Sequence, residues 1–191
     1  MNQKIQVVIL FLFVNLFAFA QNDLLKLGTE ISFSSEKYVL TRTGKPYNNY
    51  YIQEYIRASE NPQNFTKSIV IMAIVDTTTT DHLLSLKIKE LDKMKEKGTK
   101  VDYKPFINEE EGRMIEYSIH DEVSFQWNIQ RFEVQKTKSS KDVGFIFSYV
   151  ERKKITTEQS LEKIKSLVNE KMIGYVNEVG AITLPKVIIE D

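Results

Sequence analysis

The 191-residue sequence predicts an α+β domain in which a curved antiparallel sheet of about six strands packs with two helices. Three observations support this fold class. Segments with strand periodicity occupy both halves of the chain. Helical periodicity occurs within residues 81–98 and 156–180. The joints between the later strands are short and polar, as hairpin loops are, and too short for the crossovers that parallel strands need.

Four extended segments precede the first helix. Residues 31–33 alternate apolar with polar side chains, and residues 38–40 follow a Ser-Ser-Glu turn. Residues 43–46, with the sequence Thr-Gly-Lys-Pro, form a second turn signal. Residues 68–75 are apolar on both faces, which predicts a central strand that is covered on both sides.

The remaining segment, Tyr50–Ile56, is rich in tyrosine. Strand alternation places Tyr50 on one face with two isoleucines, and we expect that face to point inward. Tyr51 falls on the other face, with polar neighbours. Tyr47 and Tyr51 are the candidate binding residues, because an outward tyrosine offers a glycan or a protein partner a rigid ring with a polar tip. The alternative is that alternating tyrosines only build the strand.

The second half of the chain begins with a helix that follows residue 80 and ends at Gly98, where a left-handed cap belongs. Four strands then form an antiparallel meander, over residues 101–107, 113–119, 123–134 and 143–150. Inside the third of these strands the apolar side chains change face between Ile129 and Phe132, which predicts a β-bulge. The second helix is expected to open with the capping box at residues 156–159 and to end at Gly180.

Residues 1–20 have the pattern of a secretory signal peptide. Lys4 gives a short positive region, residues 7–17 are almost wholly apolar, and Ala-Phe-Ala follows at residues 18–20. We expect cleavage between Ala20 and Gln21, which leaves residues 21–191 as one domain. The alternative is an uncleaved membrane anchor, which needs about 20 apolar residues.

Composition excludes several classes of protein. The chain has no cysteine, so a disulfide framework, a thiolate zinc site and a bacterial lipoprotein anchor are excluded. The 26 basic and 26 acidic residues leave a net charge of −1 once Lys4 is removed, so nucleic acid is not an expected partner. No second run of 18 apolar residues follows the signal, and we expect no stable membrane insertion after cleavage. The expected location is periplasmic or secreted.

Two strand-to-helix junctions carry a family resemblance. Ser68–Val75 runs into the helix at Asp81, and Phe145–Tyr149 runs into the helix at Leu161. This order of elements, over residues 29–180, resembles the PsbP-like family. The resemblance implies a curved antiparallel sheet flanked by two helices and an exported, non-enzymatic assembly or interaction factor. It implies no catalytic residue, and the partner we expect is an envelope protein or a glycan.

The sharpest local pattern is Asp76–Thr80, between an apolar strand and a helix. We expect a threonine or Asp81 to cap the helix, because its first amides need oxygen acceptors. Two alternatives remain open. The D-x-T-x-T spacing resembles the magnesium motif of von Willebrand A domains, and Asp-Thr-Thr fits a short acceptor sequence for bacterial O-glycosylation.

Other candidate chemistry is sparse. His82 and His120 are the two histidines, and we expect both to be exposed on turns. Glu109–Glu111 is expected to be a solvated hairpin tip rather than a calcium site. Without cysteine or a Gly-x-Ser-x-Gly elbow, we predict no enzyme, no cofactor and no metal. The predicted function is therefore a non-catalytic interaction or assembly module of the bacterial envelope. The alternative is a small-molecule or glycan-binding protein that uses a concave sheet pocket or a tyrosine platform.

Overall fold

The computed structural model describes residues 22–76, 79–108, 112–136 and 141–184, together with residues 186 and 188. The expected signal peptide with its cleavage site between Ala20 and Gln21 lies outside these residues, as do residues 77–78 and 109–111. The elements follow one another in the order β1 (Glu30–Phe33), β2 (Glu36–Tyr47), β3 (Tyr50–Arg57), β4 (Lys67–Val75), α1 (Thr80–Glu96), β5 (Lys100–Asn108), β6 (Gly112–His120), β7 (Ser124–Lys136), β8 (Asp142–Lys154) and α2 (Leu161–Ala181).

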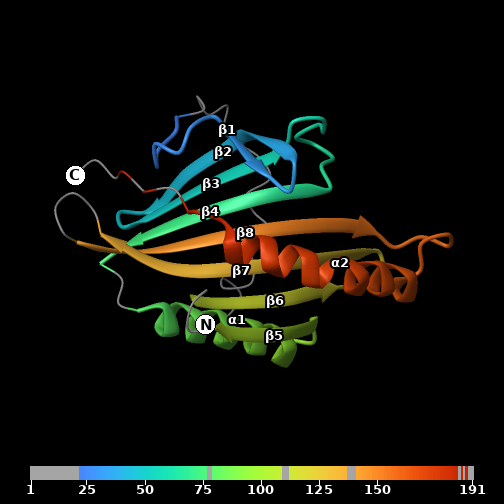
Figure 1. The fold of residues 1–191 in the computed structure, drawn as a ribbon. Helices are drawn as coiled ribbons and strands as arrows, with labels where there is room; N and C mark the ends of the chain where they lie inside the picture. Colours follow the sequence, from blue (N-terminus) through green and yellow to red (C-terminus); the bar gives the residue numbers. More distant parts are fainter. Residues whose placement is uncertain are drawn as a thin grey trace, which may run out of the picture.

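One antiparallel sheet contains the eight described strands, in the order β1-β2-β3-β4-β8-β7-β6-β5. Two meanders, β1–β4 and β5–β8, meet in the middle of the sheet, where β4 pairs with β8 along its whole length (Figure 1). The α+β class and the curved antiparallel sheet are confirmed. The central position of residues 68–75 is confirmed as well, because β4 has a paired strand on each side.

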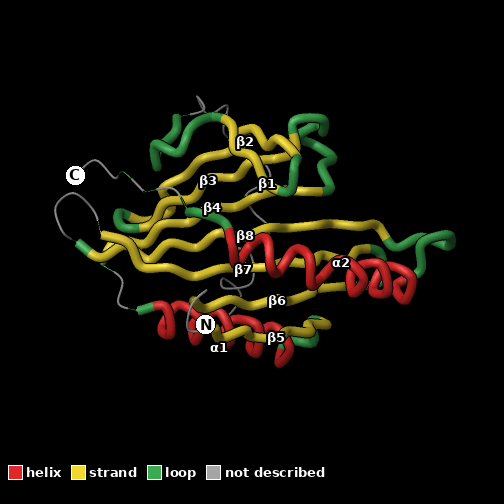
Figure 2. The backbone as a smooth tube through the Cα atoms, viewed as in Figure 1, coloured by secondary structure: helices red, strands yellow, loops and turns green. Residues whose placement is uncertain are grey.

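The two helices lie on opposite faces of the sheet. Buried side chains of α2 share one apolar cluster with Trp127 and Ile129 of β7. The apolar cluster of α1 contains Phe132, which has the opposite parity on the same strand. In Figure 2, α2 crosses in front of the strands while α1 lies at the end of the sheet formed by β5 and β6. We refer below to the α2 face and the α1 face.

The apolar side chains of β7 change from one face of the sheet to the other without a β-bulge. Residues 124–136 pair with β8 in unbroken register. Since α2 covers one part of this strand and α1 the opposite side of another part, apolar residues are needed first on one face and then on the other. The register shifts occur in β2, between Leu40 and Arg42 and between Gly44 and Tyr47. The predicted turn at residues 43–46 is wrong, because those residues extend β2 and the turn follows at residues 48–49.

Both helices have side-chain caps. Thr79 Oγ1 accepts a hydrogen bond of 3.1 Å from the amide of His82, which confirms a threonine cap for α1. Gly98 follows the helix with φ of 87°, the left-handed conformation predicted from the sequence. The N-cap of α2 is Ser160, whose hydroxyl accepts from the amide of Lys163. Thr156 instead closes a separate turn with Gln159, so the predicted capping box is wrong.

The predicted faces of β3 are reversed. Tyr51 is 7% exposed and packs in the cluster on the α2 face, whereas Tyr50 is half-buried on the α1 face. The cause is the segment before β1, which covers this part of the α2 face. The amide of Leu25 donates to Gln53 Oε1 at 2.8 Å, and the Tyr55 hydroxyl donates to the Gly28 carbonyl at 3.0 Å. Polar and tyrosine side chains can therefore point inward here, because the backbone of the covering segment forms hydrogen bonds with their polar atoms.

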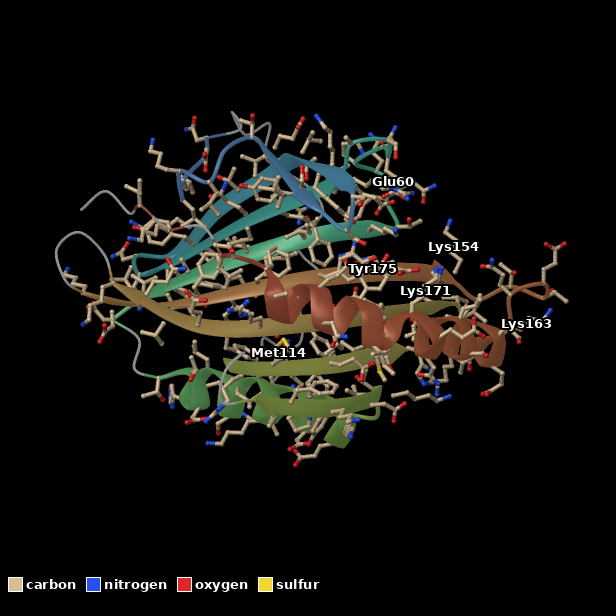
Figure 3. All side chains as sticks on the ribbon, in the orientation of Figure 1. Glu60, Met114, Lys154, Lys163, Lys171 and Tyr175 are labelled. Carbon is tan, nitrogen blue, oxygen red and sulfur yellow. The ribbon has the colours of Figure 1, made fainter. Side chains whose placement is uncertain are left out.

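The core of the α2 face is largely aromatic. Tyr175 projects from α2 toward β8 (Figure 3) and stacks on Tyr149 with ring centroids 4.7 Å apart. Trp127 meets Tyr175 edge-on at 5.8 Å. Such pairs add about 0.5–1.5 kcal/mol beyond the burial of their area, so this cluster holds α2 in a fixed position against the sheet.

Candidate functional site

A cavity of about 250 Å³ lies between α2 and the strands β5, β6 and β7. It is lined by the side chains of Asp102, Glu116, Ser118, Phe125, Trp127, Lys165, Val168 and Asn169. Polar groups predominate in this lining, although the cavity adjoins the aromatic core. It is therefore a place where a small polar molecule could be held against an apolar wall.

The local structure places these residues together. Ser118 is paired with Asp102 on one side and with Trp127 on the other, so the three side chains point to the α2 face in one row. Glu116 precedes Ser118 by two residues and shares that face. On α2, Lys165 and Asn169 are four residues apart, which brings them to the same side of the helix.

Glu116 is the most perturbed acid of the cavity. Burial raises the pKa of its carboxyl, and the hydrogen bond from Trp127 together with the charge of Lys104 opposes this shift. Trp127 Nε1 donates to Glu116 Oε1 at 2.7 Å. The tryptophan thus fixes the carboxylate in one orientation.

His120 lies next to this site at the end of β6. Its side chain is buried, with 9% of the residue exposed, and its Nδ1 has no hydrogen-bond partner in the described part of the chain. The ring stacks on Phe125 at 6.4 Å. Burial lowers the pKa of the imidazole, and the charges of Lys165 and Lys100 lower it further. The prediction of an exposed histidine is therefore wrong for His120 and correct for His82.

A weak ion pair marks the rim of the cavity. Lys165 Nζ lies 3.6 Å from Asp102 Oδ2, and the aspartate side chain is 72% exposed. Ion pairs this exposed contribute at most about 1 kcal/mol. The pair can therefore open for a ligand at little cost, and both partners can then contact that ligand.

The tyrosines predicted as binding residues lie elsewhere. Tyr47 is 67% exposed at the end of β2, and Tyr51 is buried on β3. Strands β2 and β3 are separated from β5–β7 by β4 and β8, so neither tyrosine reaches the cavity. The two do not form an outward pair either, because one ring is exposed and the other is buried. Whether Tyr47 binds a partner stays a prediction.

Sequence reasoning missed Glu116, Ser118 and Trp127 as a site. A signal was present, because β6 alternates Glu, Ser and His at residues 116, 118 and 120 with apolar residues between them. That alternation is typical of a strand with one face in water. The structure places α2 over this polar face, which turns a solvated surface into a cavity.

In the region around Asp76–Thr80, the structure shows one role, the capping of α1 by Thr79. Asp76 is exposed, and residues 77–78 are not described. Within the described ranges, no group of three or more histidine, aspartate or glutamate side chains is arranged to hold a metal ion. Over those same ranges, no helix is both long enough and apolar enough to cross a membrane.

A protein-family model matches residues 25–180, which include every described strand and all of α2 except its last residue. The match provides no link to the PsbP-like family. No curated protein matches the sequence.

Proposed function

The chain belongs to this family, which is uncharacterised, and from the cavity we propose that it is a non-catalytic binding domain for a small polyhydroxylated ligand, such as one sugar unit of a glycan. The observation that carries the proposal is the half-buried carboxylate of Glu116, held by Trp127 Nε1 at the wall of a 250 Å³ cavity. Burial raises the pKa of this carboxyl and is unfavourable for folding alone, and acids with perturbed pKa values are common at functional sites.

The lining supports a ligand with several hydroxyl groups. Glu116 offers acceptor oxygens, Ser118 a hydroxyl and Asn169 an amide that can both donate and accept. A sugar presents donors and acceptors in the same mixture. The cavity is slightly smaller than typical small-molecule pockets of about 300–1,000 Å³, so one sugar unit is the size that fits, with the rest of a glycan extending past the rim pair Asp102 and Lys165.

Binding can be tested on a glycan array and by isothermal titration calorimetry with glucose, galactose, mannose and N-acetylglucosamine. We expect at least one ligand, and we expect Ser118→Ala to weaken its binding about tenfold because a hydrogen bond is lost. Glu116→Gln should weaken it as well. Glu122→Gln is the matched control, because Glu122 is exposed at the end of the same hairpin and does not line the cavity.

Two outcomes would contradict the proposal. One is an absence of binding across the array and the four sugars. The other is a ligand whose affinity ignores Ser118→Ala and Glu116→Gln. Hydrolysis of 4-nitrophenyl glycosides that is lost in Glu116→Gln would contradict only the non-catalytic part, because a protonated glutamate beside a second carboxylate can act as a general acid.

The proposed location is outside the cytoplasm, in the periplasm or the medium. The support is the signal pattern of residues 1–20 and the Ala-Phe-Ala site. Similarity to PsbP-like proteins stays a hypothesis that rests on element order. Mass spectrometry of the protein from an expressing bacterium should show an N-terminus at Gln21, and a mature protein that retains Met1 would overturn the export proposal.

A further inference from the structure

The side chains that line the cavity under α2 have more negative than positive charge. Glu116 and Asp102 each contribute a carboxylate, whereas Lys165 contributes the only ammonium group of the lining. The other polar side chains there, Ser118 and Asn169, are uncharged. When both acids are ionised, one negative charge of the lining is therefore left without a positive one.

The two carboxylates face the same space. Asp102 is paired with Ser118, and Glu116 precedes Ser118 by two residues on the same face of the sheet. Diagonal neighbours of this kind on adjacent strands are about 7–8 Å apart. A ligand the size of one sugar ring that enters the cavity can therefore contact both acids.

No lysine of the described structure neutralises Glu116 at close range. Lys165 Nζ lies 3.6 Å from Asp102 Oδ2 at the exposed rim. Lys104 is directly opposite Glu116 on β5, but its Nζ lies 5.1 Å from the centroid of the Phe106 ring. Since Phe106 and Asp102 lie on opposite sides of Lys104 along β5, this ammonium group points away from the cavity.

The protonation of Glu116 agrees with the lack of a close countercharge. Burial raises the pKa of its carboxyl, and this effect exceeds the lowering caused by the hydrogen bond from Trp127 and by the charge of Lys104. The charge of Asp102 raises the pKa further. A positive group inside the cavity would stabilise the ionised carboxylate at short range, where solvent screens the interaction less than at the rim.

The main alternative is a ligand with a negative charge. Lys100 and Lys104 are exposed on β5 and would attract an anion from outside the cavity. Neither of them lines the cavity, and solvent and salt screen the interactions of such exposed charges. An anionic group inside the cavity would instead lie beside the carboxylates of Asp102 and Glu116, so the lining favours a cation.

We propose that the cavity prefers an amino sugar whose ammonium group lies between Glu116 and Asp102. The hydroxyl groups of the ring then face Ser118 and Asn169. An ammonium group takes the place of one hydroxyl and donates three hydrogen bonds, so both acids can accept from it. This inference rests on the sugar-binding function proposed above and adds the charge of the ligand.

The test compares sugars that differ at one position, with protein purified after expression of the full chain. Isothermal titration at pH 6.5 uses glucose, glucosamine, N-acetylglucosamine and glucuronate, in phosphate buffer to avoid a competing amine. The amine is mostly protonated at this pH, because α-amino groups have pKa values of about 8. We expect glucosamine to bind about tenfold more tightly than glucose and N-acetylglucosamine, and glucuronate to bind more weakly than glucose. High salt should reduce the preference for glucosamine.

Charge-removing variants locate the ammonium group. Glu116→Gln retains an acceptor for Trp127 Nε1 and should reduce the affinity ratio of glucosamine to glucose to about threefold or less. Asp102→Asn should reduce the ratio by a smaller factor, because this side chain is 72% exposed. Glu122→Gln removes the same charge in an exposed loop and should leave the ratio unchanged. Circular dichroism checks that each variant is folded.

The outcomes separate this inference from the function on which it rests. Equal affinities for glucose and glucosamine, both weakened by Ser118→Ala, would overturn the preference for an amine and leave the sugar site in place. A preference for glucosamine that persists in both Glu116→Gln and Asp102→Asn would overturn it too, because the ammonium group would then bind elsewhere. An absence of binding by all four sugars would contradict both proposals.

Discussion

Both faces of the sheet bury side-chain amides, and two of these amides, Gln53 and Asn128, differ in their hydrogen bonding. Gln53, on the α2 face, is 0% exposed; its oxygen accepts from the amide of Leu25, and its nitrogen donates to Tyr55 and Asp23. Asn128, on the α1 face, is as deeply buried, yet its nitrogen has no partner in the described structure. A buried amide with all its hydrogen bonds stabilises a fold, whereas one left incomplete lowers stability.

This difference indicates how the protein divides stability and function. The middle of the α2 face is packed with aromatic rings and closed by chain segments from both ends, including Leu25 and Leu184. The packing of this face is interrupted by the cavity at the β5–β7 end, next to His120, whose Nδ1 has no partner in the described structure. The α1 face has a smaller apolar cluster, and three of its buried polar atoms, Ser68 Oγ, Ser148 Oγ and Asn128 Nδ2, have no partner in the described structure. We therefore expect large stability losses from changes in the aromatic core, and small or opposite effects from changes at the cavity and at these unpaired polar atoms.

The largest effect is expected in the aromatic core. Trp127→Ala should lower the free energy of unfolding by about 4 kcal/mol, because it removes a fully buried ring and leaves Glu116 without its donor. Urea denaturation followed by circular dichroism measures this. A loss below about 1 kcal/mol, the range of surface changes, would mean that the α2 face is not the main source of stability.

A second prediction compares two tyrosines of the β2–β3 hairpin. Tyr51→Ala should lower the free energy of unfolding by about 3 kcal/mol, because the ring is 7% exposed. Tyr47→Ala should change it by less than about 0.5 kcal/mol, because that ring is 67% exposed. The reverse result, measured in the same urea titrations, would restore the face assignment expected from the sequence.

A third prediction compares one polar residue from each face. Gln53→Leu should lower the free energy of unfolding by about 2 kcal/mol, because it leaves the amide of Leu25 buried without its acceptor. Ser148→Ala should raise it by about 1 kcal/mol, because it removes an unpaired buried hydroxyl. Differential scanning calorimetry checks both variants. If both substitutions destabilise the protein, the contrast between the faces does not hold.

The smallest effect concerns pH. Burial raises the pKa of Glu116 in the folded protein, so the folded state binds more protons than the unfolded state between the two pKa values. Stability from this group is therefore lost as pH rises through that interval. Glu116→Gln removes the loss, and the variant should gain stability relative to wild type at pH 7 more than at pH 4. Glu122→Gln is the control. A difference that does not change with pH would show that the carboxyl of Glu116 is not desolvated.

Much of the fold could be predicted because it depends on local patterns. The apolar run at residues 68–75 identifies the central strand, the short polar joints identify a meander, and Thr79 and Gly98 satisfy the ends of α1 whatever the tertiary structure is. The predicted bulge in β7 failed because apolar residues on alternate faces have two explanations. A bulge is one, and cover on both faces by two different helices is the other.

The candidate site was much less accessible to sequence reasoning. The tyrosines near residue 50 were assigned to the wrong faces because amphipathic side chains obey no fixed rule for which face is inward. Tyr55 and Gln53 point into the core since backbone groups of residues 25–28 satisfy them. His120 was expected to be exposed because a strand end beside Asp121 is usually in water.

By itself, the sequence determined the periodicities, the caps and turn residues, and the excluded chemistry, because each depends on residues within a few positions of one another. Only the tertiary structure decided which face each helix covers, and with it the fate of every polar side chain on those faces. Glu116 and Ser118 form a cavity because α2 lies over them, and Ser148 Oγ and Asn128 Nδ2 are buried without a partner in the described structure where β4, β8 and β7 lie side by side. Burial is a property of contacts between distant segments, and no local pattern specifies it.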